Sequence, residues 1–147
     1  MYPTGMNQIK DTLRALVRIG YDGRVHKTFR GHQAKERYEN EIRILKVLQE
    51  RGCQNVPRLL ESDDEELKII TTNCGRRVEN MSDEKLKSLF EELKVRYGVI
   101  HDDPFLRNVT YDALRGFFCI IDFELATVLD DPNAEKGGLG EKETGRQ

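Results

Sequence analysis

Apolar residues follow a strand-like pattern at the start of the chain and a helical pattern after it. Residues 13–19 are rich in Leu, Val and Ile, residues 24–29 (RVHKTF) alternate with Val and Phe on one face, and the turn 20–23, Gly-Tyr-Asp-Gly, lies between them. This arrangement predicts a β-hairpin. Residues 34–51 then carry apolar side chains at spacings of three and four, which predicts an amphipathic helix. Its inward stripe is Tyr38, Ile42, Leu45 and Leu48.

A second hairpin follows the helix. Residues 58–62 and 67–72 are expected to form its strands around the acidic turn 63–66, which should lie in solvent. Residues 1–10 show no periodicity, and they are predicted to be an arm or a short edge strand. The order of strand, strand, helix, strand, strand favours an antiparallel sheet with one helix packed on it, which is an α+β lobe.

The rest of the chain predicts a second helix and a third hairpin. Ser82 is expected to cap a helix that runs to Tyr97, and Gly98 ends it. The apolar runs 99–100 and 117–121 are then expected to be buried strands. The inward stripe of the helix is Leu86, Leu89, Phe90 and Leu93.

The predicted organisation is one domain over residues 1–130. Its first lobe covers about 1–74 and its second covers about 76–130, with residues 74–77 crossing between them. The segment 131–147 has almost no apolar side chains, so it is expected to be a flexible tail. Its sequence GGLGEK lacks the lysine spacing of a phosphate-binding loop.

Composition narrows the class of protein. The chain has 147 residues, of which 37% are hydrophobic and 34% charged, and no apolar run is long enough to cross a bilayer. Because its N-terminus also lacks the apolar core of a secretory signal, a cytoplasmic location without membrane contact is expected. A net charge of −2 gives no reason to expect a nucleic-acid partner. Cysteines 53, 74 and 119 are odd in number and far apart, which favours reduced thiols in the core over disulfides or zinc.

Two acidic clusters and an asparagine mark the predicted site. Asp103 lies just after the apolar run 99–100, Asn108 lies in the same loop, and Asp122 follows the run 117–121. A carboxylate and an amide oxygen are hard ligands that suit Mg²⁺ held also by phosphate oxygens. Asp103 would then be free to orient or deprotonate an attacking hydroxyl.

Lys27 and Glu41 supply the charges that complete a phosphoryl-transfer site. Lys27 shares a strand face with Val25 and Phe29, which is unusual for a lysine unless an anion or a carboxylate lies there. The alternative is an edge-strand lysine that reaches to solvent. Glu41 flanks the helix stripe beside Ile42 and would hold Lys27 in place, unless it is simply a surface glutamate.

Four segments in this order resemble the protein kinase-like superfamily. HDDPFLRN (101–108) is similar to the catalytic loop H-R-D-x-x-x-x-N, and IIDFELA (120–126) to the metal-binding D-F-G segment. RVHK (24–27) is similar to the V-A-I-K strand, and NEIRIL (40–45) to the glutamate-bearing stretch of the αC helix. The resemblance implies a kinase-like fold with an antiparallel N-lobe sheet, an αC-type helix, and a truncated C-lobe built from an αE-type helix and the catalytic-loop hairpin. Atypical bacterial, lipopolysaccharide, Rio and Bud32 kinases are the nearest in kind.

The resemblance also implies roles for individual residues. Asp103 would be the catalytic aspartate, Asn108 and Asp122 would hold Mg²⁺, and Lys27 paired with Glu41 would contact the α and β phosphates of ATP. Arg107 is placed to stabilise the transferring phosphoryl group. Adenine would meet the backbone of a hinge, whose residues are Thr71, Thr72, Asn73 and Cys74.

The sequence departs from the kinase pattern at several positions. No glycine-rich loop precedes the first clear strand, where only Gly5 is available, and the first strand of the family is expected to be cut short. Asp102 replaces the arginine of H-R-D, and Phe105 replaces the lysine that usually follows the catalytic aspartate. Glu124 stands in place of the D-F-G glycine and should stiffen that segment. The chain stops about where an activation segment is expected to begin.

Two functions therefore stand as hypotheses. One is a minimal Mg²⁺-dependent ATP phosphotransferase that acts on a protein or small-molecule hydroxyl. The other is a pseudokinase, a module that binds nucleotide or a partner without turnover. A reduced C-lobe is expected to leave apolar surface on the helix 82–93, which favours a protein partner or self-association. Arg76 and Arg77 could bind an anionic substrate or simply lie in solvent.

Overall fold

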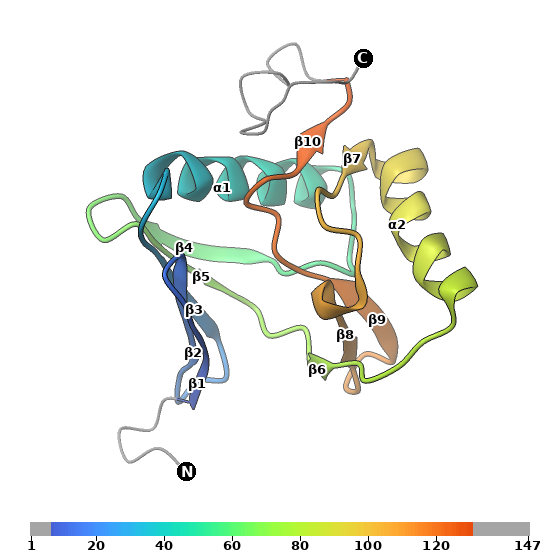
Figure 1. The fold of residues 1–147 in the computed structure, drawn as a ribbon, viewed down its shortest axis with the longest axis horizontal. Coiled ribbons are helices and arrows are strands. Elements are labelled where there is room, and N and C mark those ends of the chain that lie inside the picture. Colours follow the sequence, from blue (N-terminus) through green and yellow to red (C-terminus); the bar gives the residue numbers. More distant parts are fainter. Residues whose placement is uncertain (1–6, 131–147) are drawn as a thin grey trace.

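A computed structural model describes residues 7–130, with side chains from residue 10 onward. The predicted tail 131–147 and Gly5 lie outside these residues. Five strands form an antiparallel sheet in the order β1-β2-β3-β5-β4 (Figure 1). Their bounds are β1 Asn7–Asp11, β2 Ala15–Ile19, β3 Val25–Phe29, β4 Leu59–Asp63 and β5 Lys68–Thr71. The predicted antiparallel sheet of the first lobe is confirmed.

Of the two alternatives for residues 1–10, an arm or a short edge strand, the structure has the edge strand. Asn7–Asp11 forms β1, which pairs antiparallel with β2, so the predicted run 13–19 contains the second strand and not the first. Three residues, 12–14, separate the two strands. The first strand is therefore present as an edge strand, and the turn after it is short. At the next turn Gly23 has a φ of +78°, as the Asp-Gly hairpin signal requires.

Helix α1, Ala34–Glu50, packs across the sheet and contacts β3, β4 and β5 (Figure 1). Tyr38, Leu45 and Leu48 are buried as the periodicity predicts, whereas Ile42 is only partly buried. The helix also buries polar side chains beside the apolar stripe, because the C-terminal part of the chain covers that face. The buried polar residues of α1 are Arg37, Asn40 and Glu41.

Helix α2, Asp83–Tyr97, begins and ends where the sequence predicts. The Ser82 hydroxyl accepts a hydrogen bond from the Lys85 backbone N–H at 3.1 Å, and Gly98 ends the helix with a φ of +71°. Its stripe turns toward the core, with Leu89 and Leu93 buried. The apolar side chain that α2 leaves most exposed is Val95, at 73%.

The predicted third hairpin consists of β8, Val109–Asp112, and β9, Phe117–Ile120. Arg76–Arg77, in the predicted crossover, form β6 and pair with β8, which gives the order β6-β8-β9. A 3-10 turn, Leu106–Asn108, leads into β8. Two short strands, β7 (Val99–Ile100) and β10 (Thr127–Val128), pair antiparallel with each other.

One hydrophobic core joins the sheet, both helices and the β8–β9 hairpin. Phe29 from β3, Ile44 from α1, Leu93 from α2 and Phe123 beyond β9 belong to the same buried cluster. The three cysteines are free and buried, as expected. Within residues 7–130, neither helix has the length and apolar character needed to cross a membrane.

Gly75 provides a test of how closely the connection between the two halves approaches β8. A methyl group added at Gly75 would overlap the backbone carbonyl of Tyr111, whereas one added at Gly23 meets nothing within 4 Å, and both glycines have positive φ. Gly23→Ala should therefore show the conformational cost alone, about 1 kcal/mol of the free energy of unfolding. Gly75→Ala should cost about 1–3 kcal/mol more, because backbone atoms must move. Urea denaturation of both variants measures the difference, and equal losses would contradict the close approach.

Candidate functional site

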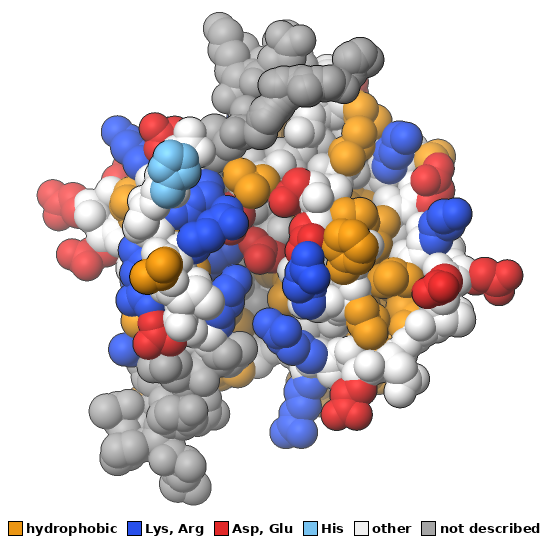
Figure 2. Space-filling view, in the orientation of Figure 1, with side chains coloured by type: hydrophobic (Ala, Val, Ile, Leu, Met, Phe, Trp, Pro, Cys, Tyr) orange, Lys and Arg blue, Asp and Glu red, His pale blue; other side chains and the backbone are white. Residues whose placement is uncertain are grey.

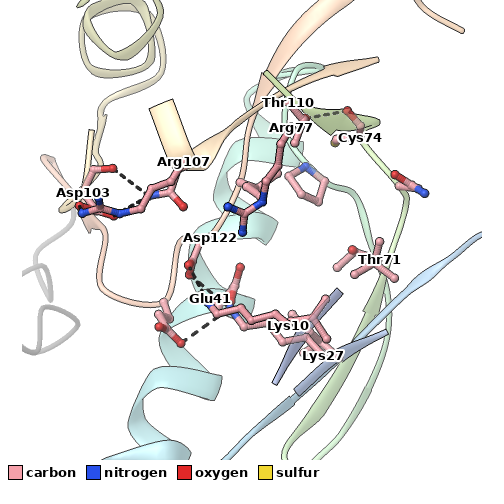
Figure 3. Close-up of a pocket in the computed structure, with 18 of the residues that line it drawn as sticks. Lys10, Lys27, Glu41, Thr71, Cys74, Arg77, Asp103, Arg107, Thr110 and Asp122 are labelled. Atoms are coloured by element: carbon pink, nitrogen blue, oxygen red, sulfur yellow. Dashed lines mark hydrogen bonds and ion pairs between the residues drawn. The ribbon is translucent and has the colours of Figure 1, made fainter. Parts of the chain in front are cut away.

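A cavity of about 1080 Å³ opens between the sheet and the β8–β9 hairpin. Figure 2 shows Lys and Arg side chains on both sides of this hollow and acidic side chains inside it. Every residue that the sequence predicted for the site lies in the cavity wall (Figure 3). These residues are Lys27, Glu41, Thr71, Thr72, Asn73, Cys74, Asp103, Arg107, Asn108 and Asp122.

Lys27 lies at the centre of a cluster of buried charges. Its Nζ atom is 2.8 Å from Glu41 Oε1, 3.3 Å from Asp122 Oδ1 and 3.7 Å from Glu124 Oε1. Only 9% of its side chain is exposed, and β3 is an interior strand of the sheet, so the edge-strand alternative is wrong. Burial by itself lowers the pKa of Lys27, but the three carboxylates outweigh burial and raise it above its usual value. The ammonium group therefore stays charged.

Glu41 joins this lysine to the segment that follows β9. It is 4% exposed, so the surface alternative is wrong. Oε1 accepts from Lys27, and Oε2 accepts from the Phe123 backbone N–H at 3.1 Å. Burial raises the pKa of Glu41, and the Lys27 ammonium opposes that rise. Both carboxylate oxygens thus have a donor, which lets the charge remain buried.

Two further side chains of α1 hold the same segment. The Asn40 amide donates to the backbone carbonyls of Glu124 and Ala126, at 2.9 and 3.0 Å. Arg37, 2% exposed, forms an ion pair with Glu124 at 3.2 Å. Because residues three and four apart lie on one helix face, Arg37, Asn40 and Glu41 act together as a polar clamp.

Asp122 faces the cavity from this clamped segment (Figure 3). It adopts a φ of +72°, a conformation that is uncommon outside glycine, asparagine and aspartate. Lys27 lies on one side of its carboxylate, and Lys10 Nζ lies 3.7 Å from Oδ2. Burial alone raises the pKa of Asp122, but the two lysines outweigh it and lower the pKa to about 2. The carboxylate is therefore ionised near neutral pH.

Asp103, Arg107 and Asn108 form a second group on the opposite wall. The Arg107 guanidinium donates to both carboxylate oxygens of Asp103, at 2.8 and 2.6 Å. The Asn108 amide nitrogen donates to Asp103 Oδ2 at 2.8 Å and to its backbone carbonyl at 2.9 Å. Since the nitrogen is used in this way, the Asn108 amide oxygen is the atom left to act as a ligand.

His101 braces the loop that carries this group. Its Nδ1 accepts from the Asp103 backbone N–H at 2.9 Å, which places the ring proton on Nε2, where it donates to the Ile121 carbonyl at 2.9 Å. The ring also packs edge-on against Phe90 and Phe123. His101 therefore links the loop of Asp103 to the segment of Asp122.

The segment 71–75 forms the far wall of the cavity. The Asn73 side chain accepts from the Gly75 backbone N–H at 2.8 Å, and Thr110 Oγ1 donates to the Cys74 carbonyl at 2.6 Å. Beyond it, Arg76 and Arg77 are exposed and also line the cavity. Apolar side chains face the same space and suit a flat apolar group. They include Val17, Val25, Ile69 and Ile121.

The sequence did not predict that several other charged residues belong to the site. Glu124 was expected only to stiffen the backbone, yet it accepts from Arg37 and lies 3.3 Å from Arg14. The i, i+3, i+4 spacing of Arg37, Asn40 and Glu41 is a signal that could have revealed the clamp. Lys10 carries no such signal, because its strand has no clear alternation.

A divalent cation fits the chemistry between the two walls. The Asp122 carboxylate and the Asn108 amide oxygen are hard oxygen donors, and both line the cavity. Three carboxylates, Glu41, Asp122 and Glu124, also lie within 4.8 Å of one another. Lys27 already lies among those three carboxylates, within 3.7 Å of each.

Comparisons with known proteins bear on the fold. No protein-family model matches the chain, and no curated protein matches its sequence. Among solved structures it is similar to the Rio2 kinase of Chaetomium thermophilum, solved as an ADP/Mg²⁺-phosphoaspartate complex, with 19% identity and a TM-score of 0.56. The match covers 90% of this chain and 51% of the Rio2 chain, so this chain spans about half of that length. The chain therefore has a protein kinase-like fold.

Removing the Lys27 charge tests the buried cluster. Lys27→Met should lower the free energy of unfolding at pH 7 by about 3–5 kcal/mol, because three carboxylates lose their common cation. Lys46→Met, on the exposed face of α1, is the matched control and should change little.

The loss of unfolding free energy in Lys27→Met should also depend on pH. The pKa of Asp122 is about 2 in the folded protein, against about 3.9 when unfolded, so its stabilising effect is present above pH 4 and disappears as the pH falls toward 2. The difference between wild type and Lys27→Met should shrink over that range. Denaturant unfolding at pH 7 and pH 3 measures this, and a pH-independent difference would contradict the cluster.

Proposed function

We propose that this chain binds Mg²⁺ and ATP in the cavity and acts as a minimal phosphotransferase on a protein or small-molecule hydroxyl. The observation that carries the proposal is the contact of buried Lys27 with both Glu41 and Asp122. That arrangement leaves a charged lysine and an ionised aspartate facing the same cavity as Asn108 and Asp103. The kinase-like fold supports the proposal, and the Rio2 complex contained ADP and Mg²⁺.

In this proposal the elements take kinase roles. Helix α1 is the αC-type helix, since it carries the glutamate that pairs with the β3 lysine. Helix α2 is the αE-type helix, and the β8–β9 hairpin follows the catalytic loop 101–108. The extended segment 71–74 is the hinge between lobes. The order of the elements and the contacts around Lys27 support these assignments.

The cavity suits the parts of ATP in turn. Adenine would lie against the apolar wall and the backbone of the hinge, whose residues are Thr71, Thr72, Asn73 and Cys74. Lys27 would neutralise the α and β phosphates. Asn108 and Asp122 would hold Mg²⁺. When bound, this ion would neutralise negative charge on the phosphates and orient them.

Asp103 is the residue proposed to face the acceptor. It would orient the hydroxyl and accept its proton, and Arg107 beside it would stabilise the charge of the transferring phosphoryl group. Phosphoryl transfer depends more on positioning than on base strength, and Asp103 is positioned by three neighbours. Those neighbours are His101, Arg107 and Asn108.

A nucleotide-binding module without turnover is the second candidate. It is favoured by the geometry of Asp103, because Arg107 donates to both of its carboxylate oxygens and Asn108 donates to one of them. An acceptor hydroxyl must displace at least part of this pairing. A protein partner or self-association remains a prediction under either function.

Nucleotide binding should depend on Mg²⁺ and on Asp122. ATP with Mg²⁺ should raise the melting temperature of the wild-type chain more than ATP with EDTA, because the metal links Asp122 to the phosphates. In Asp122→Asn this difference should disappear, whereas Asp22→Asn, an exposed aspartate in the β2–β3 turn, should keep it. Differential scanning fluorimetry measures all three proteins. An equal shift with and without Mg²⁺ in the wild type would contradict the metal site.

Turnover separates the two candidates. A phosphotransferase should release ADP from Mg–ATP or label itself with γ-phosphate, and Asp103→Asn should slow that rate by at least about 100-fold while leaving ATP affinity nearly unchanged. Radiolabelled ATP measures both products. Mg²⁺-dependent binding without any turnover would favour the binding module and reject the phosphotransferase.

A further inference from the structure

Lys10 lies in the same row of the sheet as Lys27. In the register of the sheet, Lys10 is opposite Val17, Val17 is opposite Lys27, and Lys27 is opposite Ile69. Residues directly opposite one another on neighbouring strands point to the same face. Lys10 and Lys27 therefore project from one face two strands apart, and both line the cavity (Figure 3).

The two lysines share one carboxylate. Lys27 Nζ lies 3.3 Å from Asp122 Oδ1, and Lys10 Nζ lies 3.7 Å from Asp122 Oδ2. Lys27 is held in place by Glu41, but the Lys10 side chain is 33% exposed and its contact is longer than a hydrogen bond. Lys10 is thus the member of the pair that can move.

The turn beside Lys10 is poorly suited to bind phosphates through its backbone. Residues 11–14 contain no glycine, and the Thr12 hydroxyl accepts from the backbone N–H groups of Arg14 and Ala15, both at 3.2 Å. The Thr12 backbone N–H donates to the Ala15 carbonyl at 2.9 Å. Since these three amides are used inside the turn, the Lys10 ammonium group is better placed than they are to contact an anion in the cavity.

We propose that Lys10 is a mobile phosphate ligand that also weakens binding of a divalent cation at Asp122 when no nucleotide is bound. Without nucleotide it pairs with Asp122; when a divalent cation binds Asp122, Lys10 turns to the terminal phosphates of the nucleotide. A metal ion and an ammonium group on one carboxylate repel each other, so Lys10 opposes binding of metal alone. Nucleotide removes this opposition, and the two ligands then bind cooperatively. This inference rests on the proposed function.

Neutralising Lys10 should therefore shift two affinities in opposite directions. Lys10→Gln should weaken binding of Mg–ADP about tenfold, through loss of one charge-assisted contact, and should weaken binding of AMP less than about twofold. The same variant should bind Mn²⁺ alone about fivefold more tightly. Calorimetry measures the nucleotides, and electron paramagnetic resonance measures free Mn²⁺.

Two further variants separate this role from general effects of charge or folding. Arg18→Gln removes a positive charge from an exposed side chain of β2 that does not line the cavity, so its affinities should match the wild type. Lys10→Arg keeps the charge and should retain most of the Mg–ADP affinity. A loss shared by Arg18→Gln would indicate a general field effect and overturn the inference.

Failure of the inference about Lys10 can be distinguished from failure of the proposed function. Unchanged Mg–ADP affinity in Lys10→Gln, or equal losses for AMP and ADP, would overturn the role of Lys10 and leave the proposed function standing. Unchanged or weaker Mn²⁺ binding in Lys10→Gln would overturn the proposal that Lys10 opposes metal binding without nucleotide. Failure of the wild-type chain to bind Mg–ADP at all would overturn the proposed function and this inference together.

Discussion

The buried ammonium group of Lys27 is the interaction on which the site depends. Three carboxylates from two parts of the chain converge on it, and without a cation they would repel one another in a poorly solvated space. Because the lysine comes from the sheet, Glu41 from α1 and Asp122 from beyond β9, their attraction draws three separate elements together. The same interaction keeps Asp122 ionised and directed into the cavity.

Helix α1 fixes the positions of the charged groups in this cluster. Its apolar stripe packs on the sheet, and its neighbouring polar face holds the segment 122–126 through Arg37, Asn40 and Glu41. His101 then ties the loop of Asp103 to the same segment. The two walls of the cavity are thus joined by hydrogen bonds to one backbone stretch, so a change at α1 is expected to reach the loop 101–108.

Periodicity and spacing along the chain predicted the elements that local sequence determines. The helix that contains Tyr38 and Leu45 and the hairpin closed by Gly23 follow from local patterns, and both are present. The order and spacing of acidic residues also predicted that Asp103 and Asp122 belong to one site, and both line the same cavity. The helix and the hairpin depend on residues that are neighbours in the sequence, whereas Asp103 and Asp122 come from two segments on either side of the β8–β9 hairpin.

What the sequence missed depends on contacts between distant segments. Lys10 meets Asp122 across 112 positions, and Glu124 meets Arg37 across 87. Nothing near Lys10 distinguishes it from an ordinary surface lysine, and residues 1–10 have too little alternation to separate a short edge strand from an arm. Glu124 could be compared only with the glycine of the kinase pattern, so its ion pairs could not be anticipated.

A crystal structure of the chain with Mg²⁺ and a non-hydrolysable ATP analogue would show directly whether the cavity is a nucleotide site. We expect adenine against residues 71–74, the α and β phosphates at Lys27, and Mg²⁺ between Asn108 and Asp122. Nucleotide bound elsewhere, or an unchanged Lys27–Asp122 contact in an empty cavity at saturating analogue, would contradict it.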